Sequence, residues 1–284
     1  MCSIVILKQS DNEWPLILGA NRDEMADRES LSPGRHWDDR PHIIAGKDLS
    51  AGGTWIGIND YGLVAAIMNR MNTLGPASDK RSRGELVLDA LEHADASESL
   101  NAMIEIEKNS YRGFNMFIAD NLNAYWIKSD EDSESIEYFN IPDGLSMITA
   151  YDRNDLSSDR IKNYLEKFSL SNQPNPSKQE WQDWEMLLGS TYSKNNDPLS
   201  AMCVKTDMGF QTVSSSLIAL PTFQPNYGKN KPVYKYANGS PDTTQYFDIE
   251  IWIVYIFLKY WFYLPLSLIL IFLPSFLVLL DHFE

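Results

Sequence analysis

The residue whose type and position most clearly suit a chemical role is Cys2, which directly follows Met1 in the opening stretch MCSIVIL. If Met1 is removed, Cys2 carries both a thiol and a free α-amine. An α-amine has a typical pKa of about 8, so it can act as a general base toward the neighbouring thiol. One residue would then supply a nucleophile and its base. The alternative is that Cys2 is a small residue at the start of a buried strand, because free cysteines are often buried.

A second group of polar residues lies in ILGANRDEM, at the end of the next apolar run. A hairpin between the two runs would bring this group back beside Cys2. There, the carboxylate of Asp23 could hold the α-amine, and the guanidinium of Arg22 could favour the thiolate. Asn21 and Glu24 complete the candidate group. The alternative interpretation is a solvated turn.

Two further stretches place candidate residues at strand ends. In AGGTWIGI, a pair of glycines that includes Gly53 permits close backbone approach or a simple turn, and we predict that Gly53, Thr54 and Trp55 bind substrate. In AAIMNR, the amide of Asn69 could serve an oxyanion hole, with Arg70 contacting substrate. The alternative is that Asn69 only ends a strand.

The elements that would position these residues are antiparallel strands, interrupted and followed by helices. The spacing of Ser82 and Glu85 predicts a capping box ahead of a helix in LVLDALEHA. Further helices are predicted in SLNAMIEIEK, SSDRIKNYLEKF and KQEWQDWEMLL, and late strands in AMCVKT and TVSSSLIAL. Together they predict an α+β sandwich of two sheets packed face to face with helices outside.

Composition narrows the classes of function. The net charge of -15 and the pI of about 4.7 have the wrong sign for binding nucleic acid or an anionic membrane surface. The two cysteines, Cys2 and Cys203, cannot build a disulfide framework, which favours a reducing compartment such as the cytoplasm. The sequence has no HExxH, GxSxG, P-loop or GxGxxG motif, so we predict neither a metal nor a cofactor.

The end of the chain differs from the rest. From Tyr260 to Leu280, about 21 positions carry no charged residue, which is enough to span a bilayer as a helix. Pro265 and Pro274 interrupt this stretch. We therefore predict one domain over residues 1–248 and a hydrophobic extension over 249–284, which is either a membrane anchor or a non-native tail.

The ordered set of motifs resembles the NRDE family, also called the Transport and Golgi organisation 2 family. The motifs are the N-terminal Met-Cys, NRDE at 21–24, GGTWIGI at 52–58 and RSRGEL at 81–86. The similarity extends from Met1 to about Phe247. It implies a four-layer αββα sandwich of N-terminal nucleophile hydrolase type, with Cys2 in the nucleophile position.

A wider resemblance connects ILGANRD and YGLVAAIMN to cysteine-type N-terminal nucleophile amidases, the penicillin V acylase and bile salt hydrolase group. It implies that Asp23 holds the amine and that Asn69 binds the oxyanion. The leading hypothesis is thus a hydrolase for a C-N amide bond of a small molecule. The resemblance to the NRDE family also implies an alternative, a protein that binds or traffics haem or another hydrophobic ligand. The 8 Trp and 14 Tyr could line a pocket for such a ligand.

The chain also departs from the pattern of those amidases. Their arginine beside the nucleophile falls at Ala20, so Arg22 would have to substitute from a neighbouring position. Their second oxyanion asparagine falls near Thr149 and Tyr151, either of which could donate a hydrogen bond. Their late arginine falls near Ser215.

Overall fold

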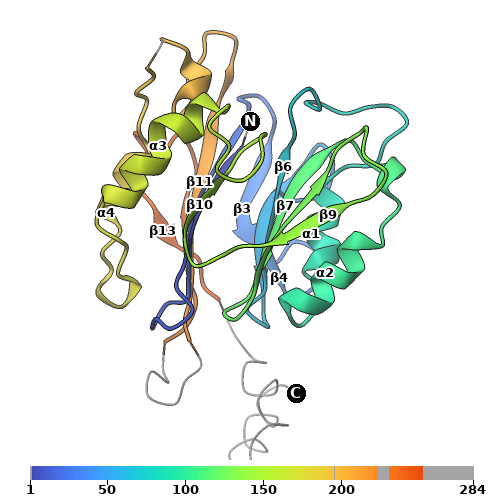
Figure 1. Cartoon of the computed structure of the whole chain (residues 1–284), viewed down its shortest axis with the longest axis horizontal. Helices are drawn as coiled ribbons and strands as arrows, with labels where there is room; N and C mark the ends of the chain where they lie inside the picture. The colour runs from blue at the N-terminus through green and yellow to red at the C-terminus, as the bar shows by residue number, and fades with distance from the viewer. Residues whose placement is uncertain (1, 195, 223–229, 252–284) are drawn as a thin grey trace, which may run out of the picture.

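The computed structural model describes residues 2–194, 196–222 and 230–251, which form two antiparallel sheets packed face to face with helices on both outer faces (Figure 1). The first sheet has the order β10 (Gly144–Ile148), β1 (Ser3–Lys8), β2 (Leu16–Met25), β11 (Phe210–Leu220), β12 (Val233–Ala237) and β13 (Phe247–Asp248). The second has the order β3 (Ser30–Gly34), β4 (Ile43–Asp48), β5 (Ile56–Asn59), β6 (Val64–Asn69), β7 (Phe114–Ala119), β8 (Ala124–Ser129) and β9 (Glu137–Asn140). The predicted four-layer αββα architecture is confirmed.

The helices divide between the two outer faces. On the second sheet lie α1 (Gly84–Ala90) and α2 (Ala96–Ile104), and on the first lie α3 (Asp159–Leu170) and α4 (Gln182–Leu188) (Figure 1). Three short 3-10 turns span Lys108–Ser110, Pro176–Lys178 and Pro198–Ser200. Each sheet is therefore covered on both faces.

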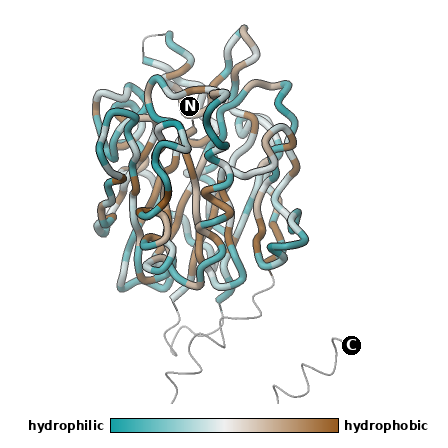
Figure 2. Tube along the Cα trace, turned by 90° about the vertical axis from the view of Figure 1, so that its right-hand side faces the viewer, coloured by the Kyte–Doolittle hydropathy of each residue, from teal (hydrophilic) through white to brown (hydrophobic). Residues whose placement is uncertain are grey.

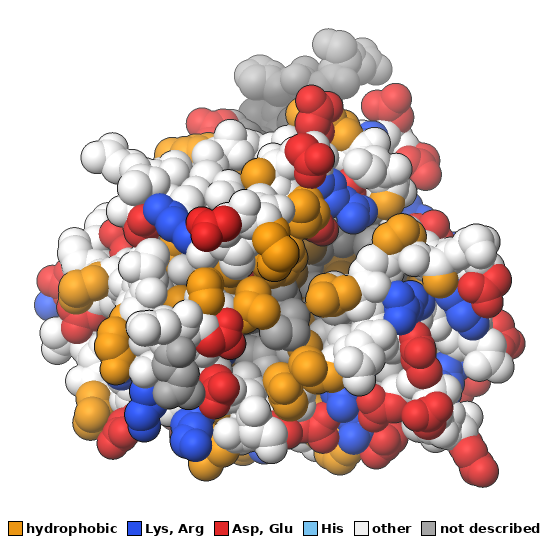
Figure 3. Space-filling view, turned by 90° about the horizontal axis from the view of Figure 1, so that it is seen from above, with side chains coloured by type: hydrophobic (Ala, Val, Ile, Leu, Met, Phe, Trp, Pro, Cys, Tyr) orange, Lys and Arg blue, Asp and Glu red, His pale blue; other side chains and the backbone are white. Residues whose placement is uncertain are grey.

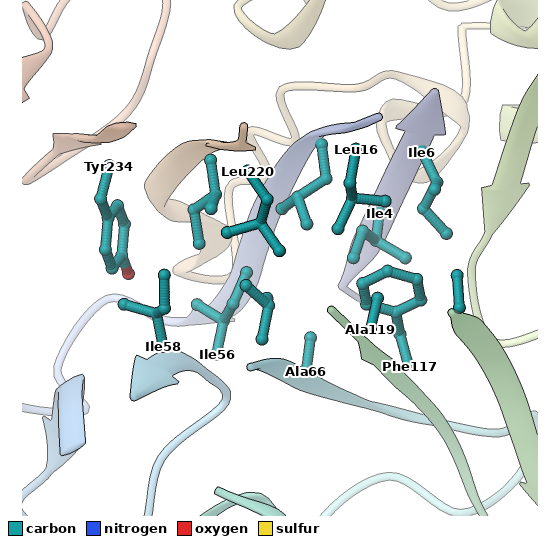
Figure 4. Packing of buried hydrophobic residues seen from close by; sticks show 14 of the residues in the cluster. Ile4, Ile6, Leu16, Ile56, Ile58, Ala66, Phe117, Ala119, Leu220 and Tyr234 are labelled. Carbon is teal, nitrogen blue, oxygen red and sulfur yellow. The ribbon is translucent and has the colours of Figure 1, made fainter. Parts of the chain in front are cut away.

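Apolar side chains fill three layers, and β1 contributes to two of them. Ile4 and Ile6 face the layer between the sheets (Figure 4), whereas Val5 and Leu7 face α3 and α4. Successive side chains of a strand point to opposite faces, so a strand covered on both sides reads as a continuous apolar run. Burying a side chain such as Ile6 contributes about 1.5–3 kcal/mol. Figure 2 shows the same trend, with hydrophobic residues along the strands and polar ones in the connections at both ends.

Three local expectations differ from the structure. The predicted capping box is wrong: Arg83 is the N-cap of α1 without a side-chain cap, and the carboxylate of Glu85 pairs with Arg81 instead. The fourth predicted helix begins late, at Gln182, because Gln179 adopts a left-handed φ of 59°. The stretch AMCVKT is not a strand, since Cys203 N donates to the carbonyl of Ser190 rather than to a sheet.

No helix within the described ranges is long and apolar enough to cross a bilayer. The predicted hydrophobic extension lies outside the described residues from position 252 onward, so both interpretations of it stay predictions.

Candidate active site

The first hairpin brings Cys2 to the end of β2. Ser3 pairs with Asn21 in the antiparallel register of β1 and β2. The thiol of Cys2 consequently lies 3.9 Å from the carbonyl oxygen of Asp23. The predicted juxtaposition of Cys2 with the NRDE segment is confirmed.

The carboxylate of Asp23 is buried and held from two sides. Arg160 Nη1 lies 2.8 Å from Oδ2, with both side chains almost wholly inaccessible to solvent. Thr212 Oγ1 donates to Oδ1 at 2.6 Å, and the same hydroxyl accepts from Val204 N at 2.8 Å, which directs its proton toward Asp23. The carboxylate beside Cys2 is thus fixed in one orientation.

Arg160 holds the carboxylate of Asp23, and sequence reasoning did not identify this contact. It lies in the first turn of α3, where it also donates to Ser3 Oγ and to the carbonyl of Leu199, each at 3.1 Å. A cation in the first turn of a helix opposes the helix dipole. That mismatch was the available signal that Arg160 needs a buried anionic partner.

Arg22 projects toward the layer between the sheets. Its guanidinium lies 4.1 Å from the centre of the Trp55 ring, and Nη1 donates to Ser30 Oγ at 2.9 Å. A cation over an indole face is attracted by the ring quadrupole. This contact joins the end of β2 to the segment that follows the glycine pair.

A cleft of about 290 Å³ opens over Cys2 at the end of the sandwich that carries the N-terminus. Its lining includes eight predicted site residues: Cys2, Arg22, Asp23, Glu24, Gly53, Thr54, Trp55 and Asn69. Figure 3 looks onto this end and shows hydrophobic side chains gathered around a central hollow, with acidic and basic side chains beside and around them. The side-chain amide of Asn69 has no hydrogen-bond partner among the described residues, so it is available to a ligand in the cleft.

The two glycine motifs meet in the wall of this cleft. A Cβ added at Gly53 would lie 2.6 Å from the carbonyl carbon of Gly84, and Thr54 N donates to the Gly84 carbonyl at 3.1 Å. Gly52 has a φ of +75°, a left-handed conformation that favours glycine. The glycine pair therefore serves close backbone approach, and it brings GGTW against RSRG.

Asn21 and Arg70 lie outside the cleft and are engaged elsewhere. Asn21 Nδ2 donates to the carbonyls of Leu188 and Met202 at 2.9 Å each, which ties β2 to the segments near α4. The guanidinium of Arg70 binds the side chains of Asp130, Asn115 and Asp152. In the structure both side chains have architectural partners, and their predicted roles in catalysis and substrate binding stay predictions.

Thr149 and Tyr151 line a smaller cavity of about 120 Å³ together with Arg160. Thr149 Oγ1 lies 3.3 Å from Ser158 Oγ, at the start of α3. These residues share that cavity with Arg160 and do not line the cleft over Cys2. Their predicted role in substrate binding stays a prediction.

The electrostatics of the cleft determine the state of the thiol. Burial raises the pKa of the Cys2 thiol above its ordinary value; the charge of Asp23 adds to this effect and the charge of Arg22 opposes it. A thiol with a raised pKa is protonated at neutral pH, and only the thiolate is strongly nucleophilic. Nucleophilic chemistry at Cys2 therefore needs a base.

A groove of about 590 Å³ lies at the opposite end of the sandwich, beside Lys8 and Asp143, which are paired at 2.6 Å. Its lining contains no cysteine. Within the described residues, no group of three or more His, Cys, Asp or Glu side chains could hold a metal ion.

Sequence comparison matches residues 1–224 to the family described as Transport and Golgi organisation 2. The Transport and Golgi organization 2 homolog of Mus musculus is 38% identical to this chain over 114 residues. The Transport and Golgi organization protein 2 homolog of Homo sapiens is 38% identical over 116 residues. Each alignment covers 39% of this chain and 41% of the relative. The chain thus matches less than half the length of these curated relatives.

Solved structures that align with most of this chain were also found. The Caenorhabditis elegans ortholog of N-acylethanolamine-hydrolyzing acid amidase aligns with a TM-score of 0.53 at 14% identity, covering 81% of this chain and 98% of that one. Penicillin V acylase from Agrobacterium tumefaciens aligns with a TM-score of 0.43 at 11% identity, covering 89% and 98%. The predicted sandwich of N-terminal nucleophile hydrolase type is confirmed as the fold.

Proposed function

This chain belongs to the Transport and Golgi organisation 2 family, and on that premise we propose that it is a cysteine hydrolase that cleaves a C-N amide bond of a small molecule. One observation carries the proposal: Cys2 meets the end of β2 at Asp23, whose carboxylate is fixed by Arg160 and Thr212 below an open cleft. The fold shared with a nematode protein named as an amidase supports the same reaction class. Fold alone does not establish turnover, so the proposal rests on the geometry of the site.

Activation begins with removal of Met1, which frees the α-amine of Cys2. The carboxylate of Asp23 accepts hydrogen bonds from this amine and orients it toward the thiol. Because burial raises the pKa of the thiol, the amine is needed as a base at neutral pH. A free thiol of this kind is stable in a reducing compartment, which agrees with a cytoplasmic location.

The reaction proceeds through a thioester. The amine takes the proton of the Cys2 thiol, and the thiolate attacks the amide carbonyl carbon to form a tetrahedral oxyanion. The amide of Asn69 and backbone N–H groups stabilise this oxyanion. The C-N bond then breaks, the leaving amine receives the proton, and water hydrolyses the thioester to release the carboxylic acid and restore the thiol.

Two segments of the cleft bind the substrate around the attacked carbonyl. Thr54 and Trp55 belong to the wall built by the glycine contact, and Glu24 extends the end of β2. A cleft of about 290 Å³ lies near the lower end of the range for small-molecule sites. A compact amide therefore fits better than a polymer.

The first test is the intact mass of the purified chain before and after a thiol alkylator at pH 7. We expect a mass without Met1 and one rapidly added label, lost in Cys2→Ala and retained in Cys203→Ala. Cys203 is the matched control because its side chain is buried. Retained Met1, or labelling that survives Cys2→Ala, would contradict the proposed nucleophile.

The second test is turnover of a panel of fluorogenic acyl amides. We expect no hydrolysis by Cys2→Ala and reduced hydrolysis by Cys2→Ser, because a hydroxyl ionises far less readily than a thiol. Unchanged turnover in Cys2→Ala would rule out the mechanism.

A further inference from the structure

The cleft over Cys2 has an excess of positive charge, although the chain as a whole carries -15. The cations that line it are Arg22, Arg28, Lys80, Arg81, Arg83 and Arg112. The carboxylates that line it are Asp23, Glu24 and Asp48. A cleft of opposite sign to the rest of the surface attracts anionic ligands.

Most of these cations are already paired. Arg28 binds Asp48 at 2.6 Å, and Arg81 and Arg112 each contact a glutamate outside the cleft lining. Lys80 lies 3.7 Å from Asp79 and donates to the carbonyl of Asn109. Within the described residues, Arg22 and Arg83 have no carboxylate within ion-pair distance. Arg22 is covered by Trp55, which leaves Arg83 as the cation best placed to meet a ligand.

The guanidinium of Arg83 is held from one side and available on the other. Nη1 donates to the carbonyls of Thr73 and Gly113, both at 2.9 Å. In the described part of the chain, Nε and Nη2 have no hydrogen-bond partner. The group is thus fixed in place with unused donors, which lowers the entropic cost of binding a planar anion.

The local field also favours an anion at this position. Burial and the nearby charge of Arg112 lower the pKa of Arg83 to about 10. Arg83 therefore stays charged at neutral pH, in surroundings that disfavour its positive charge. A bound carboxylate would compensate that charge. The remaining cleft lining includes apolar side chains at Trp55, Leu74 and Phe210, which suit an acyl chain.

We propose that the amide substrate of this site carries a carboxylate, which Arg83 binds while Cys2 attacks the amide, as in an N-acyl amino acid. This inference rests on the proposed function and specifies its substrate class. Hydrolysis would release a fatty or other carboxylic acid and a free amino acid, with one water consumed. Arg83 determines specificity and takes no part in bond making.

The test compares two substrates that differ at one group: N-decanoylglycine and N-decanoylisobutylamine, in which an isopropyl group replaces the carboxylate. The released primary amine is measured with an amine-reactive dye. We expect kcat/KM to be on the order of 10- to 100-fold higher for the carboxylate in the wild-type chain. An equal or inverted preference would overturn the inference while leaving the amidase proposal intact.

Variants then locate the preference. Arg83→Gln should reduce the carboxylate preference at least tenfold, and Arg83→Lys should keep part of it. Because Arg83 also holds Thr73, a second pair avoids its backbone contacts: Ala77→Glu and Ala77→Gln alter a cleft-lining position and differ only in charge. We expect Ala77→Glu to lower the preference and Ala77→Gln to preserve it. Equal behaviour of the Ala77 pair would overturn the inference.

Binding separates failure of this inference from failure of the proposed function. If neither substrate is hydrolysed, the amidase proposal fails, and calorimetry with Cys2→Ala then measures affinity for the two ligands directly. Tighter binding of N-decanoylglycine that weakens with salt and with Ala77→Glu would support the anion site. Equal affinity, or no binding of either ligand, would overturn it.

Discussion

Replacing Arg160 by methionine removes the charged partner of Asp23 while keeping a long apolar side chain in α3. The pair is separated by 2.8 Å, and the two side chains are 4% and 0% exposed. Removing one member of a buried ion pair leaves the other charge poorly compensated and typically costs about 3–5 kcal/mol. We therefore expect Arg160→Met to lower the free energy of unfolding by that amount and to slow alkylation of Cys2.

A variant of an exposed ion pair shows how much stability is lost when any charged residue is replaced by methionine. Lys205 pairs with Asp242 at 2.5 Å, but Lys205 is 46% exposed. Exposed pairs contribute about 0–1 kcal/mol. Lys205→Met should consequently lower the free energy of unfolding by less than about 1 kcal/mol.

The assay is urea denaturation at pH 7, followed by tryptophan fluorescence, for Arg160→Met, Asp23→Leu and the double variant. A buried ion pair replaced as a unit by apolar residues is often nearly neutral, so the double variant should lose about 1–3 kcal/mol less than the sum of the single losses. Additive losses, or an Arg160→Met loss no larger than that of Lys205→Met, would refute the argument that this pair fixes the carboxylate beside Cys2.

Three other changes test the site. Gly53→Ala forces a methyl group to 2.6 Å from the backbone of Gly84. The control is Gly62→Ala, where φ is +80° but the space is open, and where thermal unfolding should show a loss of stability of roughly 1 kcal/mol. Gly53→Ala should lose more stability than this control, and equal losses would contradict the close approach. Asn21→Ala removes two hydrogen bonds to carbonyls, so it should destabilise the fold by about 1–3 kcal/mol and leave the alkylation rate of Cys2 unchanged; a slower rate at full stability would restore a catalytic role. Burial raises the pKa of the Cys2 thiol, so in a form that keeps Met1 the alkylation of Cys2 should be slow at neutral pH and faster in the alkaline range. The midpoint of the rate against pH should lie above that of free cysteine. A midpoint at or below that of free cysteine would contradict the raised pKa.

The alternative function, binding of haem or another hydrophobic ligand, stays a prediction. Titration with haem distinguishes it from the amidase proposal: saturable change in the Soret band that persists in Cys2→Ala would favour a binding protein.

Sequence reasoning succeeded where the contacts are local. The hairpin that joins β1 and β2 follows from two apolar runs and a polar turn, and it places Cys2 beside the NRDE segment at a separation of 21 residues. The continuous apolar run of β1 also predicts a strand buried on both faces. Because two strands joined by a short turn pair antiparallel, these features needed no tertiary information.

The prediction failed for AMCVKT, which forms only one isolated bridge with a strand, between Lys205 and Gln211. AMCVKT has the composition of a strand, yet its amides bond to the carbonyl of Ser190 and to the hydroxyl of Thr212. The irregular segment then contributes to the site, since Val204 orients the hydroxyl that binds Asp23.

The sequence by itself determined the fold class and the placement of Cys2 beside the segment that carries Asp23. Only the tertiary structure decided what surrounds them: Arg160 reaches Asp23 from 137 residues away, and Gly84 reaches Gly53 across the wall of the cleft. Local periodicity records which face of an element is apolar, but it does not record which distant side chain meets a buried charge. That choice depends on how the helices pack onto the sheets. Here the packing of α3 brings Arg160 to Asp23, beside Cys2, and so assembles the candidate active site.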